Sequence, residues 1–591
     1  MRTQDSNAWI HRRSARMSRR GLIRGGVVTG LGLTGAALLG CATTPKPSAP
    51  AQTPSAASSP TGPTAPARPG VPVVKGTPKD GGTWTLPIAD TSLQQDMHTA
   101  LNQSIWHDLS ERALEPDPWT NEVTAGIVEK WEIPDNTHFV LHVRKGVNLH
   151  NKPPWNGREF DAEDLAFNIN RIAGNTAAAE GLPKTAFQRL DTLAGMQTVE
   201  VVDKYTVKVT MAKPSASWLA GFLEWRNVMM PKGIVEVGFK DPVKFAGPGS
   251  FMLTEFVPGV REVFTKHPGY YRPGEPHFDK VVRTVVADTS ATIAGFIAKQ
   301  FGAVGTGSQQ DDQTIKAARP DALMYSTPGN QWLYLRPNVK FGVFTDFRVR
   351  KALQLGMDYP ALGEGYYGEG WGYTGPVFSG YADSWSPEKV KSLPGYNPDT
   401  KAKDIAEAQK MLSAAGHANG DGVSFEIIGG PGTGIRIAQK ENSLRFQAQM
   451  AKVFPGMKMT IRILGDQAQW AAAQTGKAFQ MMSFSSVAQP TAASEATSIY
   501  HSKGGRNYGN FENAEADALL EKAAATLDLK ERTAIFDTFQ TKFMDEWMPM
   551  YALYVEPKRT MVQPNVGGYE KVVGPWSSGL TQHRKGSLYY V

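Results

Sequence analysis

The only cysteine among the 591 residues, Cys41, is the residue with the most specific chemistry. It follows Leu38, Leu39 and Gly40 and precedes a tract rich in proline, alanine, serine and threonine. A disulfide needs a second cysteine, so this thiol has no partner within the chain. The run from Leu38 to Cys41 resembles a lipobox, in which the cysteine becomes the lipidated first residue of the mature protein. The alternative is a signal cut at another bond, which would discard Cys41.

Other residues that could do chemistry are sparse. His142 and His150 are near one another in the sequence, but zinc sites commonly have three or four ligands. The stretch from Gly429 to Gly434 is rich in glycine, yet it lacks the Lys-Ser/Thr ending of a phosphate-binding loop and indicates a turn. We find no Gly-x-Ser-x-Gly elbow and no His-Glu-x-x-His motif. We therefore expect no catalytic residue, no metal and no cofactor, and we expect that the protein is not an enzyme.

Residues 1–40 have the tripartite build of an export signal. Basic residues precede an apolar run, Val27 to Gly40, which is shorter than the roughly 20 residues that span a bilayer. Ser18-Arg19-Arg20-Gly21-Leu22 resembles a twin-arginine motif, although paired arginines also occur in signals of the general export route. Residues 41–80 contain no aromatic residue, and their composition predicts a disordered tether. Either route predicts that the mature protein works outside the cytoplasmic membrane.

The net charge of +7 is concentrated at the start of the chain. Residues 1–40 contain seven arginines and one acid, and four more cations follow up to Lys79, so the rest of the chain carries −3. A slightly acidic region of this kind has no electrostatic footprint for nucleic acid. The 41% hydrophobic and 20% charged residues are ordinary for a soluble globular protein, and the length predicts about two to four domains.

Strand and helix patterns alternate from Gly81 to the end of the sequence. Val199 to Met211 is typical of two strands around a turn at Asp203-Lys204. Phe160 to Ile172 has helical spacing, with Asp161 as the N-cap and Asp164 supporting the first turn. Glu515 to Leu527 and Lys530 to Phe543 are also predicted helices, and the pair Arg348 and Arg350 is predicted to start a helix and to lie on the surface. This mixture predicts an α/β protein and not a bundle or an all-β sandwich.

Ordered motifs along this region resemble one known family. The first motifs are His142-Val143-Arg144-Lys145-Gly146-Val147, His150 and Phe160-Asp161-Ala162-Glu163-Asp164. The later motifs are Gly247-Pro248-Gly249-Ser250-Phe251, His267-Pro268-Gly269-Tyr270-Tyr271, Asn338 with Phe344 to Leu353, and Ala402 to Gly416. Together they resemble the bacterial extracellular solute-binding proteins of family 5, the dipeptide and oligopeptide type that serves ABC importers. The resemblance covers residues 81–591.

The resemblance implies a two-lobed α/β periplasmic-binding-protein fold of type II, of the large cluster with a third domain and a hinge between the lobes. Transferred to this chain, lobe I takes residues 81–105, 230–330 and 550–591, with residues 106–229 as its inserted subdomain, and lobe II takes residues 331–549. The expected hinge crossings are Trp332 to Asn338 and Met548 to Tyr554. A few backbone torsions there would absorb the closure of the lobes.

For function, the resemblance implies capture of a peptide or another small organic solute between closing lobes. Delivery to the permease subunits of an ABC importer would follow. A ligand that contacts both lobes favours the closed state through its differential affinity. We expect a monomer that is anchored through Cys41 in the periplasm or on the outer face of the cytoplasmic membrane. Two alternatives stay open: a binding or sensory lipoprotein that is not coupled to an importer, and an extracytoplasmic enzyme.

Aromatic clusters and one strand provide the predicted ligand contacts. Rigid rings with polar tips suit a binding cavity, and the candidates are Trp332, Tyr334, Trp371, Tyr373 and Trp385. In peptide binders of the family, the stretch matching Phe479 to Pro490 often has a Trp followed by an Asp that holds the peptide ammonium. Here Phe484 replaces the Trp, and Ser485 and Ser486, which with Phe484 are further candidates, occupy the place of the acid. A peptide with a free amine is therefore a poor candidate unless another acid, such as Glu495, substitutes.

Overall fold

The computed structural model describes residues 71–91, 95–100, 105–135, 137–215, 217–432, 435–576 and 585–591. They belong to one compact unit, Gly70–Val591. Cys41, the export signal and most of the tether lie outside the described residues, so lipidation and export stay predictions. Among the described residues, no helix is both long enough and apolar enough to cross a membrane.

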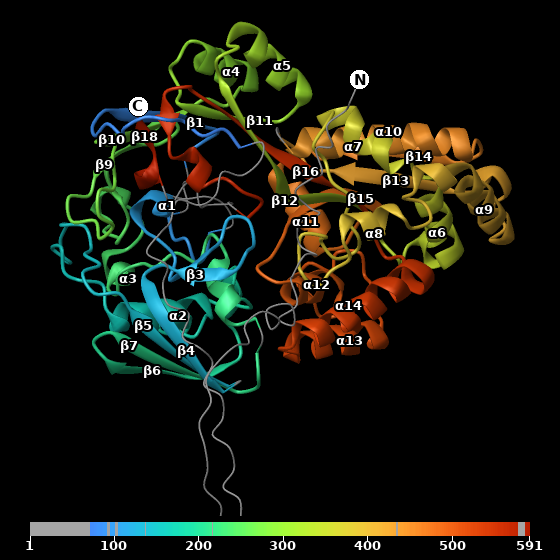
Figure 1. Cartoon of the computed structure of the whole chain (residues 1–591). Coiled ribbons are helices and arrows are strands. Elements are labelled where there is room, and N and C mark those ends of the chain that lie inside the picture. The colour runs from blue at the N-terminus through green and yellow to red at the C-terminus, as the bar shows by residue number, and fades with distance from the viewer. Residues whose placement is uncertain are drawn as a thin grey trace, which may run out of the picture. The chain divides into compact units, whose positions relative to one another are not determined.

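A four-stranded sheet joins the start of the folded region to a segment far along the chain (Figure 1). Its strands, in order, are β1 (Thr83–Ile88), β10 (Lys280–Val285), β9 (Arg261–Lys266) and β8 (Phe251–Val257). Strand β1 begins the region of alternating strand and helix patterns that starts at Gly81, and it pairs in parallel with β10. Phe251 and Leu253 of β8 are fully buried while the residue between them is half-buried, so one face of the sheet lies on a core.

A second, antiparallel sheet contains the two strands predicted between Val199 and Met211. Its strands, in order, are β4 (Val128–Asp135), β5 (His138–Val143), β7 (Thr206–Met211) and β6 (Met196–Asp203). The turn follows Asp203, which confirms the predicted hairpin, although β6 begins three residues before Val199. Helix α2 (Ala162–Ile172) packs against β5, β6 and β7.

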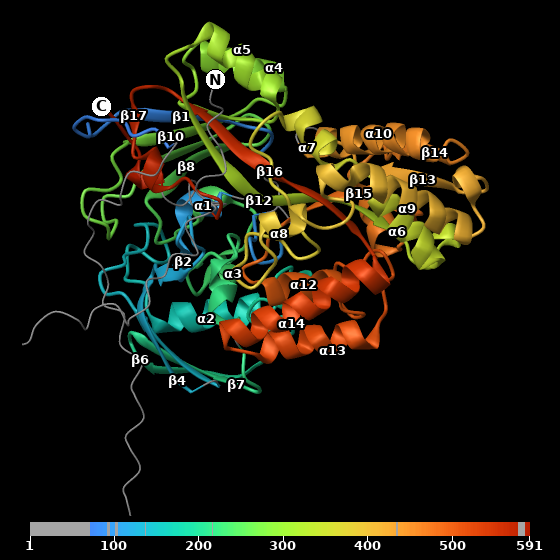
Figure 2. The same ribbon diagram turned by 45° about the vertical axis from the view of Figure 1, so that its right-hand side comes forward.

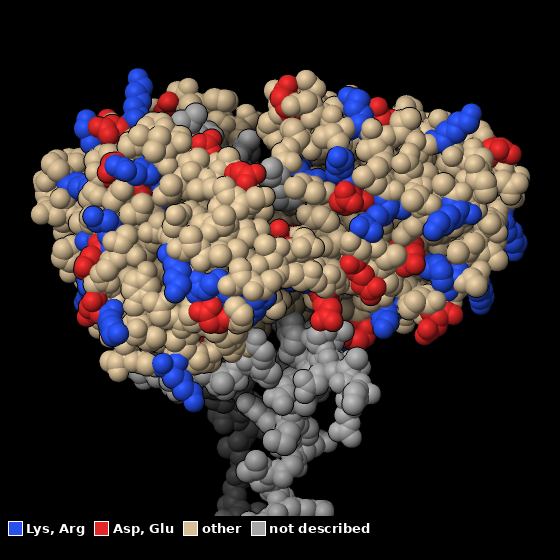
Figure 3. All heavy atoms as spheres, turned by 90° about the horizontal axis from the view of Figure 1, so that it is seen from above, with Lys and Arg blue, Asp and Glu red and all other residues tan. Residues whose placement is uncertain are grey.

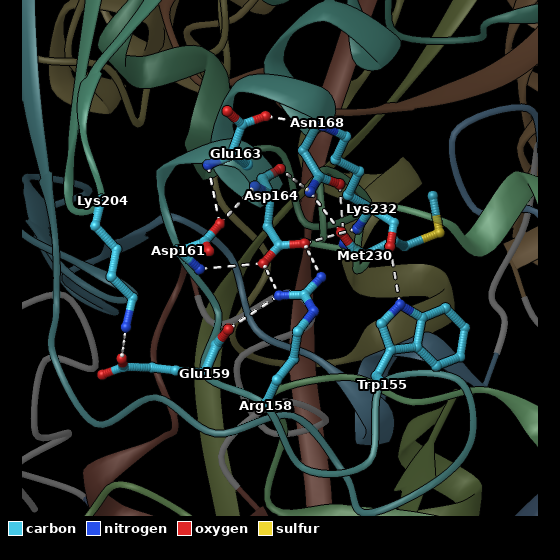
Figure 4. Close-up of polar contacts among 10 residues, drawn as sticks. All are labelled: Trp155, Arg158, Glu159, Asp161, Glu163, Asp164, Asn168, Lys204, Met230 and Lys232. Carbon is cyan, nitrogen blue, oxygen red and sulfur yellow. Dashed lines mark hydrogen bonds and ion pairs between the residues drawn. The ribbon is translucent and has the colours of Figure 1, made fainter.

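Helix α2 begins at a capping box, which confirms the predicted roles of Asp161 and Asp164 (Figure 4). The Asp161 carboxylate accepts hydrogen bonds from the backbone N–H groups of Glu163 and Asp164, and Asp164 accepts one in return from Asp161 N–H at 3.1 Å. The buried Asp164 also accepts from both terminal nitrogens of Arg158, at 2.6 and 2.7 Å, and from Lys232 N–H at 2.7 Å. This carboxylate therefore joins the start of the helix to two other segments.

Two long strands run side by side through a six-stranded sheet. The strands, in order, are β11 (Ala303–Thr306), β16 (Tyr551–Val562), β12 (Leu323–Pro337), β15 (Met481–Val487), β13 (Ser424–Gly429) and β14 (Lys458–Ile463). Strand β11 pairs with one end of the β12–β16 pair, and β15 pairs with the other end. The register of β12 and β16 shifts between Pro328 and Trp332. The pairing of β12 with β16 is therefore irregular between the end at which β11 pairs and the end at which β15 pairs.

Helices surround the half of this sheet that contains β13, β14 and β15 (Figure 1). The longer ones are α6 (Phe347–Gly356), α7 (Tyr359–Tyr367), α9 (Lys401–Ala414), α10 (Ile435–Val453), α11 (Gln467–Thr475), α12 (Ala492–Tyr500), α13 (Ala514–Ala525) and α14 (Leu529–Lys542). The predicted helices at Glu515 and Lys530 are α13 and α14, and each begins one residue earlier than predicted. The family motif from Ala402 to Gly416 coincides with α9. Helix α13 packs on both α12 and α14 (Figure 2).

The remaining elements lie mostly on the other side of the long strands. Helices α4 (Thr289–Ile297) and α5 (Gln309–Ala318) pack beside β11. The short elements are α1 (Trp106–Leu109), β2 (Leu114–Pro116), β3 (Val123–Ala125), α3 (Ile234–Val237), α8 (Pro387–Lys391), β17 (Val566–Gly567) and β18 (Tyr589–Tyr590).

Two large buried clusters hold the unit together. One contains side chains from Trp332 to Val555 together with Trp576. The other contains side chains from Trp84 to Val281, together with several after β11 and at the C-terminal end of the chain. The predicted lobe boundaries stay a prediction, but the two clusters give each half of the chain an apolar core of its own.

Helix α6 starts at the predicted place, but one of its arginines is not on the surface. Arg348 is exposed and pairs with Asp346 at 2.6 Å, as predicted. Arg350 is buried, and its guanidinium donates to the backbone carbonyls of Phe344, Trp547 and Met548. The prediction of a surface position for Arg350 was wrong because two of its three carbonyl partners, Trp547 and Met548, lie 197 and 198 residues further along the chain, which no local pattern reveals.

Candidate functional site

A small cavity lies between segments that are far apart in the sequence. Its walls come from β2 and the loop after it, from the turn after a 3-10 helix (Leu219–Leu223), from the middle of β12 and from the end of β15. The lining residues are Pro116, Asn121, Leu223, Glu224, Trp225, Asn330, Val487, Ala488, Gln489, Pro490 and Trp576. Its volume is about 20 Å³, which is room for a single water molecule.

One hydrogen bond joins two of these walls directly. Asn121 Nδ2 donates to the carbonyl oxygen of Pro490 at 3.0 Å. Asn121 has a φ of 59°, in the left-handed region that asparagine adopts more readily than most residues. Its backbone N–H donates to the Asp117 carbonyl and closes the turn that presents the side chain. The wall that follows β2 and the wall that follows β15 are therefore in contact in this conformation.

Two tryptophans supply the aromatic surface of the cavity. The ring of Trp225 stacks on His107, with centroids 4.8 Å apart, and the Arg226 guanidinium lies 4.9 Å from it. The ring of Trp576 contacts those of Phe378 and Tyr381, with centroids 5.7 and 5.5 Å apart. Rings held on several sides lose little entropy when they bind a ligand, which suits them to be walls of a binding site.

Glu224 puts a negative charge on one wall. Arg226 Nε donates to Glu224 Oε1 at 2.6 Å. Burial opposes ionisation of this carboxyl, but the guanidinium groups of Arg226, Arg189 and Arg506 outweigh it and lower the pKa of Glu224 to about 2. Arg506 contacts Gln489 on the wall opposite Glu224. The positive charge of Arg506 on one wall therefore acts on the negative charge of Glu224 on the other.

Strand β15 places three predicted ligand residues beside the cavity. Ser485 Oγ accepts hydrogen bonds from Gln331 Nε2 at 3.0 Å and from Gln439 Nε2 at 2.9 Å. Ser486 Oγ accepts one from Arg506 Nη1 at 3.3 Å. Phe484 is half-buried. None of these three residues, two serines and one phenylalanine, lines the cavity, whereas Val487, the next residue, does. Their assignment as ligand contacts stays a prediction.

The five other predicted residues lie deeper or on another part of the molecule. Trp332 and Tyr334 are buried, and Tyr334 meets both Trp332 and Phe484, with ring centroids 5.2 and 5.8 Å apart. The half-buried rings of Trp371 and Tyr373 form a pair 4.9 Å apart. Trp385 Nε1 donates to an α14 carboxylate, Asp537, at 2.6 Å. None of these five lines the cavity, so their role in binding also stays a prediction.

Glu495, the acid considered as a substitute for the missing aspartate, lies behind the cavity wall. It is buried, and one carboxylate oxygen accepts hydrogen bonds from Gln489 N–H at 3.0 Å and Tyr381 OH at 3.1 Å. Burial raises the pKa of Glu495 to about 7, although these donors and Arg506 oppose the shift. Glu495 does not line the cavity, and it fixes the backbone of Gln489 instead.

The two histidines considered as metal ligands have other partners. His150 is buried, and its Nε2 lies 3.0 Å from the carbonyl oxygen of Gly249, which His267 Nδ1 also approaches at 3.0 Å. His142 Nε2 lies 3.2 Å from Glu132. The described part of the chain contains no group of three or more His, Cys, Asp or Glu side chains arranged to hold a metal.

Figure 3 shows basic and acidic side chains interspersed over one face of the molecule.

Most of the cavity lining could not be predicted from the sequence. Glu224-Trp225-Arg226 gives the only local signal, a ring between two opposite charges. Asn121, Asn330 and Gln489 belong to no motif, since only tertiary contacts bring them together.

Comparison with known proteins gives a consistent result. The profile of the bacterial extracellular solute-binding proteins, family 5, matches residues 122–533. The chain is 23% identical to heme-binding protein A of Haemophilus influenzae, over 80% of this chain and 85% of that protein. It is 28% identical to the dipeptide-binding protein of Escherichia coli, over 48% of this chain and 57% of that protein. Among solved structures, the oligopeptide-binding protein AppA from Bacillus subtilis aligns with a TM-score of 0.70 at 20% identity, over 87% of this chain and all of AppA.

Proposed function

The chain belongs to the bacterial extracellular solute-binding proteins of family 5 and has their two-lobed α/β fold, and from this premise we propose that it delivers a captured solute to an ABC importer. The solute is a peptide or another small organic compound that both lobes hold. The observation that carries the proposal is the cavity at which the loop after β2, the end of β15 and the long strand β12 meet.

Closure of the lobes is the central step of the proposed mechanism. With room for one water, the cavity does not admit a solute unless its walls separate. The hinge crossings stay as predicted, Trp332 to Asn338 and Met548 to Tyr554, where few backbone torsions need to change. The irregular pairing of β12 and β16 between Pro328 and Trp332 adjoins the first crossing and supports this placement. A solute that contacts both walls then stabilises the closed state in proportion to its differential affinity for it. The permease distinguishes the closed state from the open one.

The lobes, the anchor and the partner form one arrangement in this proposal. Residues 106–229 are an insert of lobe I, and residues 331–549 form lobe II. Cys41 carries the lipid that holds a monomer outside the cytoplasmic membrane, and the tether of residues 41–80 lets the folded region reach the permease. The protein performs no covalent chemistry, because a binding protein needs only capture and release.

The relatives bear on the solute class without deciding it. One is named for haem and another for dipeptides, so solutes within the family differ widely in size and charge. We propose peptides as the first class to test. Strand β15 lacks a carboxylate between Ser485 and Val487, which argues against recognition of a free ammonium there.

Native mass spectrometry of protein purified from its host, followed by thermal unfolding with peptides and sugars, tests the proposal. A solute that binds only the folded state adds RT ln(1 + [L]/Kd) to its stability, about 2.7 kcal/mol at 100 times Kd. We expect a co-purified small molecule and a rise in melting temperature with at least one solute class. Turnover of the bound compound, or scattering curves that are identical with and without a bound solute, would contradict the proposal.

A further inference from the structure

The guanidinium of Arg506 contacts Ser486, one of the residues that occupy the place of the ligand-binding acid in peptide binders of the family. Arg506 Nη1 donates to Ser486 Oγ at 3.3 Å. With the Gln489 amide in the orientation that satisfies both of its polar atoms, Gln489 Oε1 accepts from Nη1 and Nη2 of Arg506, each at 3.0 Å. Gln489 lines the cavity. The Arg506 guanidinium therefore lies directly behind the cavity wall, half-buried and fixed in orientation.

Neutral groups hold this guanidinium. Among the described residues no carboxylate oxygen lies within 4 Å of Arg506, whereas other arginines of the unit, such as Arg158 and Arg171, have one or two carboxylates as direct partners. The two nearby acids have other donors, since Arg226 holds Glu224 and the Gln489 N–H and Tyr381 OH groups hold Glu495. Glu224 and Glu495 act on Arg506 only at longer range. An anion that reaches the half-buried guanidinium directly therefore gains a strong partner.

A second guanidinium strengthens the positive potential on this wall. Arg436 Nη1 donates to Gln439 Oε1 at 3.0 Å, and Gln439 in turn donates to Ser485 Oγ at 2.9 Å. The Arg436 guanidinium lies 5.3 Å from the ring centre of Phe484. Phe484 to Ser486, the segment that matches the ammonium-binding stretch of peptide binders, is therefore flanked by a cation on each side.

Resting on the proposed function, we propose that the cleft recognises a carboxylate on its solute, and that Arg506 binds this group when the lobes close. A guanidinium matches the two oxygens of a carboxylate in a paired geometry that an ammonium does not reproduce. Opening of the cleft exposes Arg506 beside Gln489. Closure then withdraws the new ion pair from water, and the attraction between the two charges becomes stronger in the less polar surroundings. A ligand ammonium has no corresponding acid on this wall and is not required for binding.

Peptides with modified ends test the inference on the full chain. Pools of di- and tripeptides are supplied with free ends, with an acetylated amine, with an amidated carboxylate, and with both ends blocked, and Kd is measured by calorimetry. We expect the acetylated pool to bind as tightly as the free pool and the amidated pool to bind at least about tenfold more weakly. Equal binding of the amidated and free pools, or loss of binding on acetylation alone, would overturn the inference.

Variants assign the effect to Arg506. In Arg506→Gln the ratio of Kd between amidated and free pools should fall to near one, while Arg506→Lys, which keeps the charge but not the paired geometry, should retain only part of it. Arg462→Gln, which removes an exposed cation paired with Glu426, is the matched control and should keep the ratio of the unmodified protein. A ratio that survives in Arg506→Gln contradicts the inference. If that variant does not fold, the lysine variant and the four pools still decide it.

Failure of the proposed solute class gives a different result. If none of the four peptide pools binds the unmodified protein, peptides are wrong as the class, and aldonic acids are compared with their neutral parent sugars in the same way. Tighter binding of the acids that depends on Arg506 supports the inference with a sugar acid as solute. The absence of carboxylate-dependent binding in both sets overturns it.

Discussion

The carboxylate of Asp164 accepts four hydrogen bonds, and its donors come from three residues. It receives two hydrogen bonds from Arg158 and one each from the backbone N–H groups of Asp161 and Lys232. An asparagine at this position would turn an N–H₂ group toward donors and leave the guanidinium without its counter-ion. Asp164 is fully buried and Arg158 is half-buried. We expect the change to lower the free energy of unfolding by about 2–4 kcal/mol.

We therefore expect Asp164→Asn to lower the melting temperature by several degrees without changing Kd for a solute. Glu163→Gln is the control, since Glu163 is exposed and its carboxylate pairs with the exposed Lys232 Nζ. An exposed pair contributes roughly 0–1 kcal/mol, so the control should unfold almost like the unmodified protein. Equal effects of the two substitutions would show that Asp164 is not the structural link inferred here.

Glu495 gives the unit a pH dependence that can be isolated. Its folded pKa is about 7, above the ordinary value of 4.5. The stability that its proton contributes is therefore fully present below pH 4.5 and is lost as pH rises through 7, by up to about 3 kcal/mol. Glu495→Gln keeps an oxygen for Gln489 N–H and Tyr381 OH but does not titrate. We expect its melting temperature, relative to the unmodified protein, to be higher at pH 8 than at pH 5. A difference that does not change with pH would contradict this prediction.

At the scale of elements, Arg350 ties helix α6 to the end of the long C-terminal helix. Its guanidinium donates to Trp547 O at 2.8 Å and to Met548 O at 3.1 Å, where a π-helical turn (Phe543–Trp547) ends at a left-handed Met548. The carbonyls of such a turn lack the usual helical donors, so the side chain of another element satisfies them. The turn directs the chain from α14 into β16.

Arg350→Met should remove these hydrogen bonds while keeping much of the apolar stem. We expect a loss of about 2–4 kcal/mol in the free energy of unfolding, because buried carbonyls are left without donors, and faster hydrogen exchange in residues 543–550. Arg348→Met, which removes the exposed ion pair with Asp346, is the control and should change stability by less than about 1 kcal/mol. Exchange that is equally slow in both variants would contradict the role of Arg350.

At the scale of the whole unit, the two walls of the cavity touch through Asn121 and Pro490. Asn121→Gly removes the amide but keeps a residue that adopts the left-handed φ of 59° without strain. Loss of one hydrogen bond of about 1 kcal/mol weakens the closed state, so Kd for a solute should rise up to about fivefold. Asn419→Gly, at another left-handed position that does not line the cavity, should leave Kd unchanged. Kd is measured by calorimetry, and identical values for the two variants would count against the closed state described here.

Local patterns in the sequence correctly indicated many elements of this fold. The aspartate N-cap of α2, the hairpin of β6 and β7 and the starts of α13 and α14 depend on residues a few positions apart. The motifs around Phe160 and Phe344 also identified the family, because they record how those segments pack. For the same reason the missing acid of β15 was visible without a structure.

Tertiary contacts decided the rest, and above all the site. Trp225, Gln489 and Asn330 meet at one cavity although long stretches of chain separate them, and no periodicity of 2 or 3.6 residues carries that information. Burial likewise separates Arg350 from Arg348 and Glu495 from a ligand-binding acid. A residue's type and spacing limit what it is able to do, but which groups face it, and whether water reaches it, depend on how distant segments pack.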